Sequence, residues 1–342
     1  MLNLNGSLIR FAVATLAVIG ALFAAPAQAE NWPTRPVRFI VPFGPGAGAD
    51  IGARLFAEKL SQKWGQAVVV ENRPGGDSIV AIQAFLSAND DHVLLFGPAG
   101  NFTVHPFNYS KLSYNPADLI PIARASNTIL ALAVKQDAPY KTAGDYLKAA
   151  ASGEFKMGGA QSKDTDEVLT RMIEKAGKVK LTYIPFKSGA DAVNAALAGQ
   201  AQLVLDAIPV VVPHVRDQKL VGLAIAQPQL QAGKIKILAV LNSVRAPVYP
   251  DIPTVADAGY PNMTIDGLVG LFGTPSTPQA LREKIAADVK EVMDTDPIIK
   301  DRLTATAQLP NPGTPEEFAK ALEDQRAKLA QNARDLGVKE KQ

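Results

Sequence analysis

The sequence predicts an α/β protein of two lobes, and three features carry this prediction. Short runs of valine, isoleucine and leucine alternate with segments of helical period over most of the 342 residues. These apolar runs show no polar alternation, which is typical of parallel-rich sheets flanked by helices on both faces. The chain is also too long for one comfortable core and fits two domains.

The first group of elements lies between residues 37 and 96. Strands are predicted where the apolar run is short and rich in β-branched residues, and helices where apolar residues recur at a spacing of three or four. The predicted strands are 37–43, 67–71 and 93–96, and the predicted helices are 49–64 and 79–88.

The same pattern begins again near Ile129. The predicted strands are 130–135, 155–158, 180–185, 201–206 and 236–241, and the predicted helices are 143–151, 164–176 and 190–198. Residues 247–253 contain three prolines and are predicted to be a linker. A strand at 268–273 and helices at 278–293 and 315–336 complete the chain.

We therefore expect a second lobe inserted into the first. Residues 30–127 and 250–342 would form lobe 1, and residues 128–249 would form lobe 2. The chain would cross twice between the lobes, and these two crossings would form the hinge of a cleft.

The first 29 residues have the anatomy of a cleaved export signal. Arg10 gives a positive start, residues 11–23 are apolar, and Ala27-Gln28-Ala29 supplies the small residues that signal peptidase requires. The apolar run is shorter than a membrane span needs. A short N-terminal anchor is the alternative.

Composition excludes several classes of function. The 35 basic and 33 acidic residues leave no basic stripe for nucleic acid, and no cysteine is present to form a disulfide or carry a lipid. The signal lacks an Arg-Arg pair, which favours export in the unfolded state and argues against a cofactor loaded in the cytoplasm. We therefore expect a monomer of the periplasm that is not lipid-anchored and has no cofactor.

The usual catalytic constellations are missing as well. His92, His105 and His214 lack metal-ligand spacing, and no G-x-S-x-G motif occurs. We expect these histidines to be structural, the protein to have no metal, and its function not to be enzymatic. A hydrolase built from scattered residues is the alternative.

The most specific local feature is the loop PFGPGAGAD at residues 42–50, between a predicted strand and helix. Glycines let the backbone approach a ligand, and the amides and dipole of a helix start favour a carboxylate or phosphate. A tight turn in which Asp50 caps the helix and pairs with Arg54 is the alternative, and for these two side chains we prefer it. The candidate ligand-binding residues are Phe43, Gly44, Pro45, Gly46, Ala47, Gly48 and Ala49.

A dinucleotide fold is a competing interpretation of this loop. Gly44, Gly46 and Gly48 open a helix, and Glu71 ends the next strand as a ribose-binding acid would. The spacing is G-x-G-x-G rather than G-x-G-x-x-G, however, and Pro45 lies within it. We therefore do not expect a nicotinamide cofactor.

Three further loops follow predicted strands, where ligands of open parallel sheets bind. The first is GPAGN at residues 97–101, the second is GGAQS at 158–162, and the third is FKSGA at 186–190, where Lys187 adds a full positive charge. The acids at 164–167 have capping-box spacing and are expected to cap a helix. The candidate residues are Gly97, Ala99, Asn101, Gly159, Gln161, Ser162, Phe186, Lys187, Ser188, Gly189 and Ala190.

Several longer motifs resemble one known family. The run WPTRPVRFIVPF at residues 32–43, continued by the glycine-rich loop, resembles the opening of the substrate-binding proteins of tripartite tricarboxylate transporters, also called Bug receptors. The resemblance continues in GQAVVVENRPG at 65–75, IPFK at 184–187, LAV at 238–240 and YPDIPTV at 249–255.

This resemblance implies a two-lobed periplasmic binding protein of type II-like fold that closes on a small organic acid. The ligand carboxylate would be held by backbone amides and ordered water at 43–49 and 186–190, with Asp206 and the other loops completing the walls. The partners would be the organic acid anion and membrane subunits of the transporter. A ligand sensor feeding a sensor kinase shares every feature and is the alternative function, followed by a periplasmic enzyme.

The sequence departs from the family at two candidate positions. Ser188 stands where the family usually has glycine, and residues 158–166 replace the usual serine- and glycine-rich stretch. Both departures lie at the expected ligand site, so the resemblance implies the fold and a carboxylate ligand but not which acid is bound.

Overall fold

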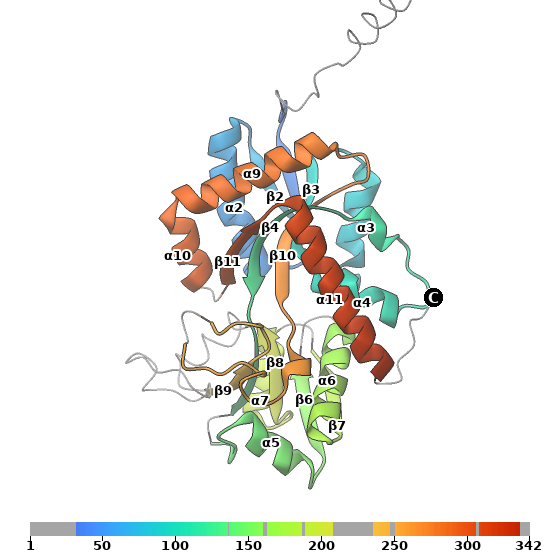
Figure 1. Ribbon diagram of the computed structural model, residues 1–342, viewed down its shortest axis with the longest axis vertical. Helices are drawn as coiled ribbons and strands as arrows, with labels where there is room; N and C mark the ends of the chain where they lie inside the picture. The colour runs from blue at the N-terminus through green and yellow to red at the C-terminus, as the bar shows by residue number, and fades with distance from the viewer. Residues whose placement is uncertain are drawn as a thin grey trace, which may run out of the picture.

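Two β-sheets, each covered by helices, lie one above the other along the long axis of the protein (Figure 1). The computed structural model describes residues 32–135, 137–159, 163–186, 189–207, 235–246, 250–305 and 308–335. The predicted export signal, Gln161, Ser162, Lys187, Ser188 and His214 lie outside these residues.

The first sheet has the strand order β11-β4-β10-β3-β1-β2. Its parallel half consists of β1 (Val37–Val41), β2 (Val68–Asn72) and β3 (Val93–Pro98). Its antiparallel half consists of β4 (Ile120–Thr128), β10 (Gly267–Gly273) and β11 (Gln308–Gly313). The helices of this part are α2 (Gly48–Trp64), α3 (Ile79–Ala88), α4 (Gly100–Asn108), α9 (Gln279–Thr295), α10 (Pro297–Ala305) and α11 (Pro315–Asp335).

The second sheet has the order β7-β6-β8-β5-β9 and is also mixed. Strands β6 (Phe155–Gly159), β7 (Leu181–Pro185) and β8 (Leu203–Ala207) are parallel, and β5 (Leu130–Lys135) and β9 (Ile235–Val240) complete the sheet, with β5 antiparallel to both of its neighbours. Its helices are α5 (Ala143–Ala150), α6 (Lys163–Gly177) and α7 (Gly189–Leu197).

The α/β class is therefore confirmed, and the predicted elements agree with the observed ones to within one or two residues at most ends. Strands β4 and β11 and helices α4 and α10 were not predicted. Pro121 is the second residue of β4, β11 contains Pro310 and Pro312, and Pro106 lies inside α4. Proline is unfavourable in central strands and helix interiors, so the sequence did not favour these three elements. The edge position of β11 accommodates its prolines.

Each sheet has its own apolar core. In the first, the rings of Phe39 and Phe56 pack on Phe96, with ring centroids 5.9 and 6.0 Å apart. In the second, the buried side chains of Leu132 and Leu205 pack with Tyr146 of α5. Burying a side chain of this size contributes about 1.5–3 kcal/mol to the free energy of unfolding. Helix α11 joins both cores, and Figure 1 shows it running beside β10 toward the second sheet.

Two short crossings join the sheets. Strand β4 ends at Thr128 and β5 begins at Leu130, so only the buried Ile129 separates them. The chain returns at residues 265–267, where Gly267 pairs with Thr128. A Cβ atom at Gly267 would lie 2.4 Å from the carbonyl oxygen of Thr128, so the two crossings can lie together only because this residue is glycine.

Asn242 and Ser243 hold the two crossings in place. The fully buried side chain of Asn242 accepts a hydrogen bond from the Leu130 amide and donates one to the Thr128 carbonyl, both at 3.1 Å. Ser243 donates from its amide and its hydroxyl to the carboxylate of Asp266. Asn242 thus holds the first crossing, and Ser243 holds the second.

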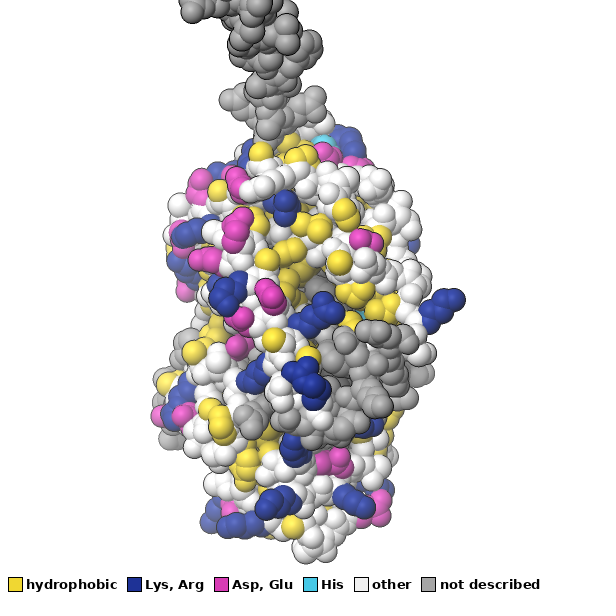
Figure 2. Space-filling model, turned by 45° about the vertical axis from the view of Figure 1, so that its right-hand side comes forward, with side chains coloured by type: hydrophobic (Ala, Val, Ile, Leu, Met, Phe, Trp, Pro, Cys, Tyr) yellow, Lys and Arg dark blue, Asp and Glu magenta, His cyan; other side chains and the backbone are white. Residues whose placement is uncertain are grey.

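The predicted lobe boundaries remain a prediction. Residues 250–266 carry the side chains of Val255, Met263 and Ile265 into the core of the second sheet. Within the described part of the chain, no helix is long and apolar enough to span a membrane. Acidic and basic side chains are interspersed on the face seen in Figure 2.

We predict that replacing Asn242 by alanine lowers the free energy of unfolding by about 1–3 kcal/mol. The substitution would leave the buried Leu130 amide and Thr128 carbonyl without their partner. Urea denaturation measures the change, and Asn194→Ala on the exposed face of α7 is the matched control. Equal effects of the two substitutions would contradict a role of Asn242 in holding the crossing.

Candidate functional site

The loops predicted to bind a ligand lie at the edges where the two sheets meet. Strands β1 and β3 are parallel, so α2 and α4 begin at the same edge of the first sheet. Strands β6 and β7 are parallel, so α6 and α7 begin at one edge of the second. Thr128 lies at the first edge, and Leu130 pairs with Ala207 at the second. Since a single residue joins them, the two edges that carry the loops face each other.

The loop between β1 and α2 presents backbone amides rather than side chains. Gly46 has a φ of 85°, which favours glycine, and Ala47 leads extended into the helix without a side-chain cap. The Ile51 amide donates to the Ala47 carbonyl. Among the described residues the amides of Gly48 and Ala49 have no recorded acceptor, as expected for the first turn of a helix. Two such donors and the helix dipole favour negative charge at this position.

The buried carboxylate of Asp50 holds this loop in its conformation. Asp50 is 2% exposed, and its Oδ2 accepts hydrogen bonds from the Gly46 amide at 2.8 Å and from Arg54 Nε at 3.0 Å. Its Oδ1 accepts from the side-chain amide of Asn72 at 2.8 Å, and that amide also donates to the Phe43 carbonyl. The predicted pairing of Asp50 with Arg54 is present, but the prediction that Asp50 is the helix cap is wrong, because the N-cap is Ala47 and Asp50 lies within the first turn. Because the Gly46 amide donates to Asp50 within the loop, it is not available to a ligand.

Hydrogen bonds keep Asp50 ionised despite its burial. Burial by itself raises the pKa of this carboxyl group, but the bonds from Arg54, Asn72 and Gly46 outweigh it and hold the pKa below its usual value of 3.8. Arg54 supplies the compensating positive charge on the same helix. The charge inside the loop is therefore balanced by Arg54.

The loop between β3 and α4 adds a second helix start at this edge. A Cβ atom at Gly97 would lie 3.0 Å from Pro42, so glycine lets the two loops pack together. The side chain of Ala99 is buried in the core and its amide donates to the Leu268 carbonyl. Asn101 lies in the first turn of α4. Added Cβ atoms at Gly44 and Gly100 would meet no atom within 4 Å, so both glycines border open space.

At the facing edge, Gly159 links two loops. Its carbonyl accepts hydrogen bonds from the Phe186 amide at 3.0 Å and from the Tyr183 hydroxyl at 3.2 Å. The ring of Phe186 packs over Gly158 and against the small core behind α7. Asp206 is 2% exposed near the end of β8, and Gly189 and Ala190 begin α7. Gly159, Phe186, Asp206, Gly189 and Ala190 therefore lie at one edge, as their positions after parallel strands predict.

The role of Asn72 was missed, although the sequence contained a signal for it. This residue ends β2 opposite Val41, the last residue of β1. Parallel neighbours place their ends together, so a polar side chain at the end of the second strand can reach the loop after the first.

The two described histidines are buried and hydrogen-bonded, in agreement with a structural role. His105 is fully buried, with its Nδ1 2.6 Å from the Tyr114 hydroxyl. Burial and the nearby charge of Asp77 raise the pKa of Tyr114, so its hydroxyl stays protonated. His105 Nε2 lies 3.4 Å from a carboxylate oxygen of Asp77.

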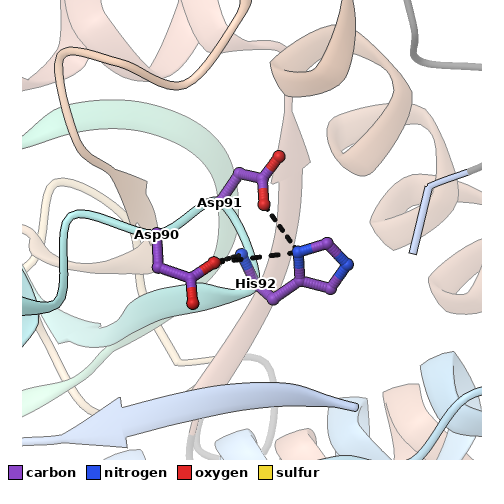
Figure 3. A group of neighbouring side chains, drawn as sticks. All are labelled: Asp90, Asp91 and His92. Atoms are coloured by element: carbon purple, nitrogen blue, oxygen red, sulfur yellow. Dashed lines mark hydrogen bonds and ion pairs between the residues drawn. The ribbon is translucent and has the colours of Figure 1, made fainter. Parts of the chain in front are cut away.

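His92 belongs to a group with possible metal ligands, Asp90, Asp91 and His92, whose ligand atoms lie within 4.8 Å of one another (Figure 3). Both oxygens of Asp90 accept from Arg35, at 2.6 and 2.8 Å. The Thr34 amide donates to His92 Nε2, so Nδ1 carries the proton and donates to Asp91. These hydrogen bonds occupy the atoms that would bind a metal and hold residues 34 and 35 against the start of β3. We therefore assign the group a structural role.

The comparisons with known proteins agree with this architecture. The family described as "Tripartite tricarboxylate transporter family receptor" matches residues 52–337. A UPF0065 protein of Bordetella pertussis is 32% identical over 80% of both chains. Protein BugT of the same organism is 26% identical over 95% of this chain and 98% of its own. The structure of MatC from Rhodopseudomonas palustris with bound malate is 25% identical, with a TM-score of 0.74 over 88% of this chain and 99% of that one.

We predict that Asp50→Asn lowers the free energy of unfolding by about 1–3 kcal/mol at pH 7, because it removes the negative charge and one of the two oxygens that together accept hydrogen bonds from three donors. The folded-state pKa of Asp50 lies below the unfolded value of 3.8. Its contribution is therefore complete above the unfolded-state value and is lost as the pH falls through the folded-state pKa.

Urea denaturation at pH 7 and pH 3 measures this difference. The gap between Asp50→Asn and the native protein should narrow at pH 3, whereas Asp301→Asn on the exposed face of α10 should have little effect at either pH. A gap that is the same at both pH values would mean that the charge of Asp50 does not stabilise the loop.

Proposed function

Because the chain belongs to the tripartite tricarboxylate transporter receptor family, we propose that it captures a small carboxylate between its two facing edges and delivers it to the membrane subunits of such a transporter. The family is one of transporter receptors, and a solved structure 26% identical to this chain is described as that of a periplasmic transporter. The observation that best supports a carboxylate ligand is the start of α2, where two amides have no recorded acceptor among the described residues; in the preceding loop, Gly44 borders open space.

Backbone amides suit this task because they bind an anion without adding a mobile charge. The Gly48 and Ala49 amides and the dipole of the 17-residue helix α2 favour negative charge at the helix start. Asp50 and Asn72 fix the loop before the ligand arrives, so little conformational entropy is lost on binding. We propose these amides as the first carboxylate site, with α4 beginning beside it.

The facing edge would complete the site when the lobes close. We propose that Lys187, Ser188 and the start of α7 contact the acid only in the closed form. Closure is favoured only if some contacts are made in that form alone. If the ligand has a second carboxylate group, we propose that this group binds at the facing edge. Because a relative is described with bound malate, small dicarboxylates are the first class to test.

We predict that malate or another small mono- or dicarboxylate raises the unfolding temperature of residues 30–342. At a hundredfold excess over the dissociation constant, binding to the folded state adds about 2.7 kcal/mol to the free energy of unfolding. Gly44→Leu and Gly100→Leu should remove the shift by filling the open space at the two helix starts. Thermal denaturation with a panel of acids measures both effects.

Gly144→Leu is the matched control, because Gly144 also lies in the first turn of a helix but at the opposite edge of the second sheet. The native protein and this control should respond equally to the acid. A shift that survives in both Gly44→Leu and Gly100→Leu would place the ligand elsewhere. No shift with any acid, in protein stripped of co-purified ligand, would overturn the carboxylate assignment.

We also propose that residues 1–29 direct export and are removed, which would place the receptor in the periplasm. The mature chain recovered from the periplasm of a bacterial host should begin at Glu30, as measured by its intact mass. Ala29→Arg should block cleavage, because signal peptidase requires a small residue there. A periplasmic protein that keeps residues 1–29 would contradict the proposal.

A further inference from the structure

A cavity of about 320 Å³ lies beside the hinge, away from the loops discussed above. Its walls come from β4, β10, β11, α6, α11 and residues 264–266, and they include the hinge residues Asn127, Ser243 and Asp266. None of the described residues of the four candidate loops lines it. Its volume is at the lower end of the range for small-molecule sites, about 300–1,000 Å³.

One charged group in this wall lacks a counter-charge. Lys328 of α11 is half-buried, and among the described residues no carboxylate lies within ion-pair distance of its ammonium group. Burial lowers the pKa of Lys328, opposed by the more distant charge of Asp266. A half-buried ammonium group without a partner is costly, and a bound anion would offset that cost.

The two carboxylates in the wall are already engaged. Asp266 accepts hydrogen bonds from the amide and hydroxyl of Ser243, and Asp324 pairs with Lys320. Arg124 uses its Nε to donate to the Asn311 carbonyl, and no carboxylate is recorded as its ion-pair partner in the described residues. The wall thus holds two cations and two carboxylates, and in the described residues neither cation has a carboxylate at ion-pair distance.

The wall has an apolar part beside its polar side chains. Met172 and Ile265 are buried and belong to the core of the second sheet, and Leu268 belongs to a core of the first. Leu329 and Ala321 add apolar surface from α11. Such a wall suits a ligand with one acidic group and a compact hydrocarbon body, which distinguishes it from the amide-lined edge at α2.

We propose that this cavity is a second binding site, for a small monocarboxylate with an apolar body, and that its occupant biases the hinge. The acid group pairs with Lys328, and the hydrocarbon body lies against Met172, Ile265 and Leu268. The walls belong to both sheets and both crossings, so a change in the angle between the sheets changes the cavity. A ligand that fits one arrangement better shifts the population toward it.

The direct test is calorimetric titration of benzoate and hexanoate into the Gly44→Leu/Gly100→Leu protein, in which the helix starts at the facing edge are filled. We expect saturable binding of at least one acid, weakened about tenfold or more by Lys328→Met, which removes a charge-assisted bond. Ala321→Leu, which fills part of the cavity, should also weaken it. Lys111→Met, at an exposed lysine with no recorded partner among the described residues, should not.

Two outcomes would overturn the site: no saturable binding of either acid, or binding that Lys328→Met and Ala321→Leu both leave unchanged. The test does not depend on the proposed function. If the facing edges bind no carboxylate at all, titration of the same acids into the native protein gives the same answer about the cavity.

The effect on the hinge rests on the lobe closure that we propose above, and it has its own measurement. The chain has no cysteine, so Lys148→Cys on α5 and Lys290→Cys on α9 can carry spin labels on the two lobes. Benzoate should shift the distribution of distances between the labels, and Lys328→Met should abolish the shift. If saturating benzoate leaves the distance distribution unchanged, the proposed effect on the hinge is wrong, but the proposed binding site is not contradicted.

Discussion

The arrangement of the molecule depends on one short crossing between the sheets. A single residue, Ile129, separates the last residue of β4 from the first of β5, and Asn242 hydrogen-bonds to the backbone on both sides of it. So short a connection fixes which edges of the two sheets meet. Those are the edges at which the parallel strands end. The helices that follow these strands therefore begin in the same region of the molecule, where the two sheets face each other. The proposed binding function therefore follows from the hinge as much as from the glycine-rich loop.

The loop itself combines two opposite electrostatic requirements. An anion site needs unpaired amides and positive potential, yet this loop is built around the buried carboxylate of Asp50. The conflict is resolved because every recorded hydrogen bond to Asp50 comes from a group that shapes the loop, and Arg54 balances its charge. A carboxylate can hold the Gly46 amide, the helix and β2 together at once, which no neutral side chain of its size does as well.

The sequence predicted most of what depended on local pattern, with α10 as an exception. The parallel strands, their helices and the glycine-rich loops follow from short apolar runs, helical periodicity and turn residues, and Asp50 and Arg54 were paired correctly from their spacing. What depended on contacts distant in sequence could not be predicted. Asn242 lies 114 residues from Thr128, and a single asparagine after an apolar run carries no local sign of its partner. Strands β4 and β11 contain prolines, and tertiary pairing rather than propensity makes them strands.

Asp266 connects the hinge to the rest of the first lobe. Its carboxylate is held by Ser243, which follows the second sheet, and its carbonyl accepts from Gln325 of α11, which packs on the first. The second crossing is therefore held from both sides by groups that belong to different sheets. If the sheets rotate about the crossings, at least one of these contacts must change, and the cavity beside Asp266 changes with it. A molecule bound in that cavity would thus contact residues at both crossings, and this is how we propose that it acts on closure without touching the acid at the facing edges.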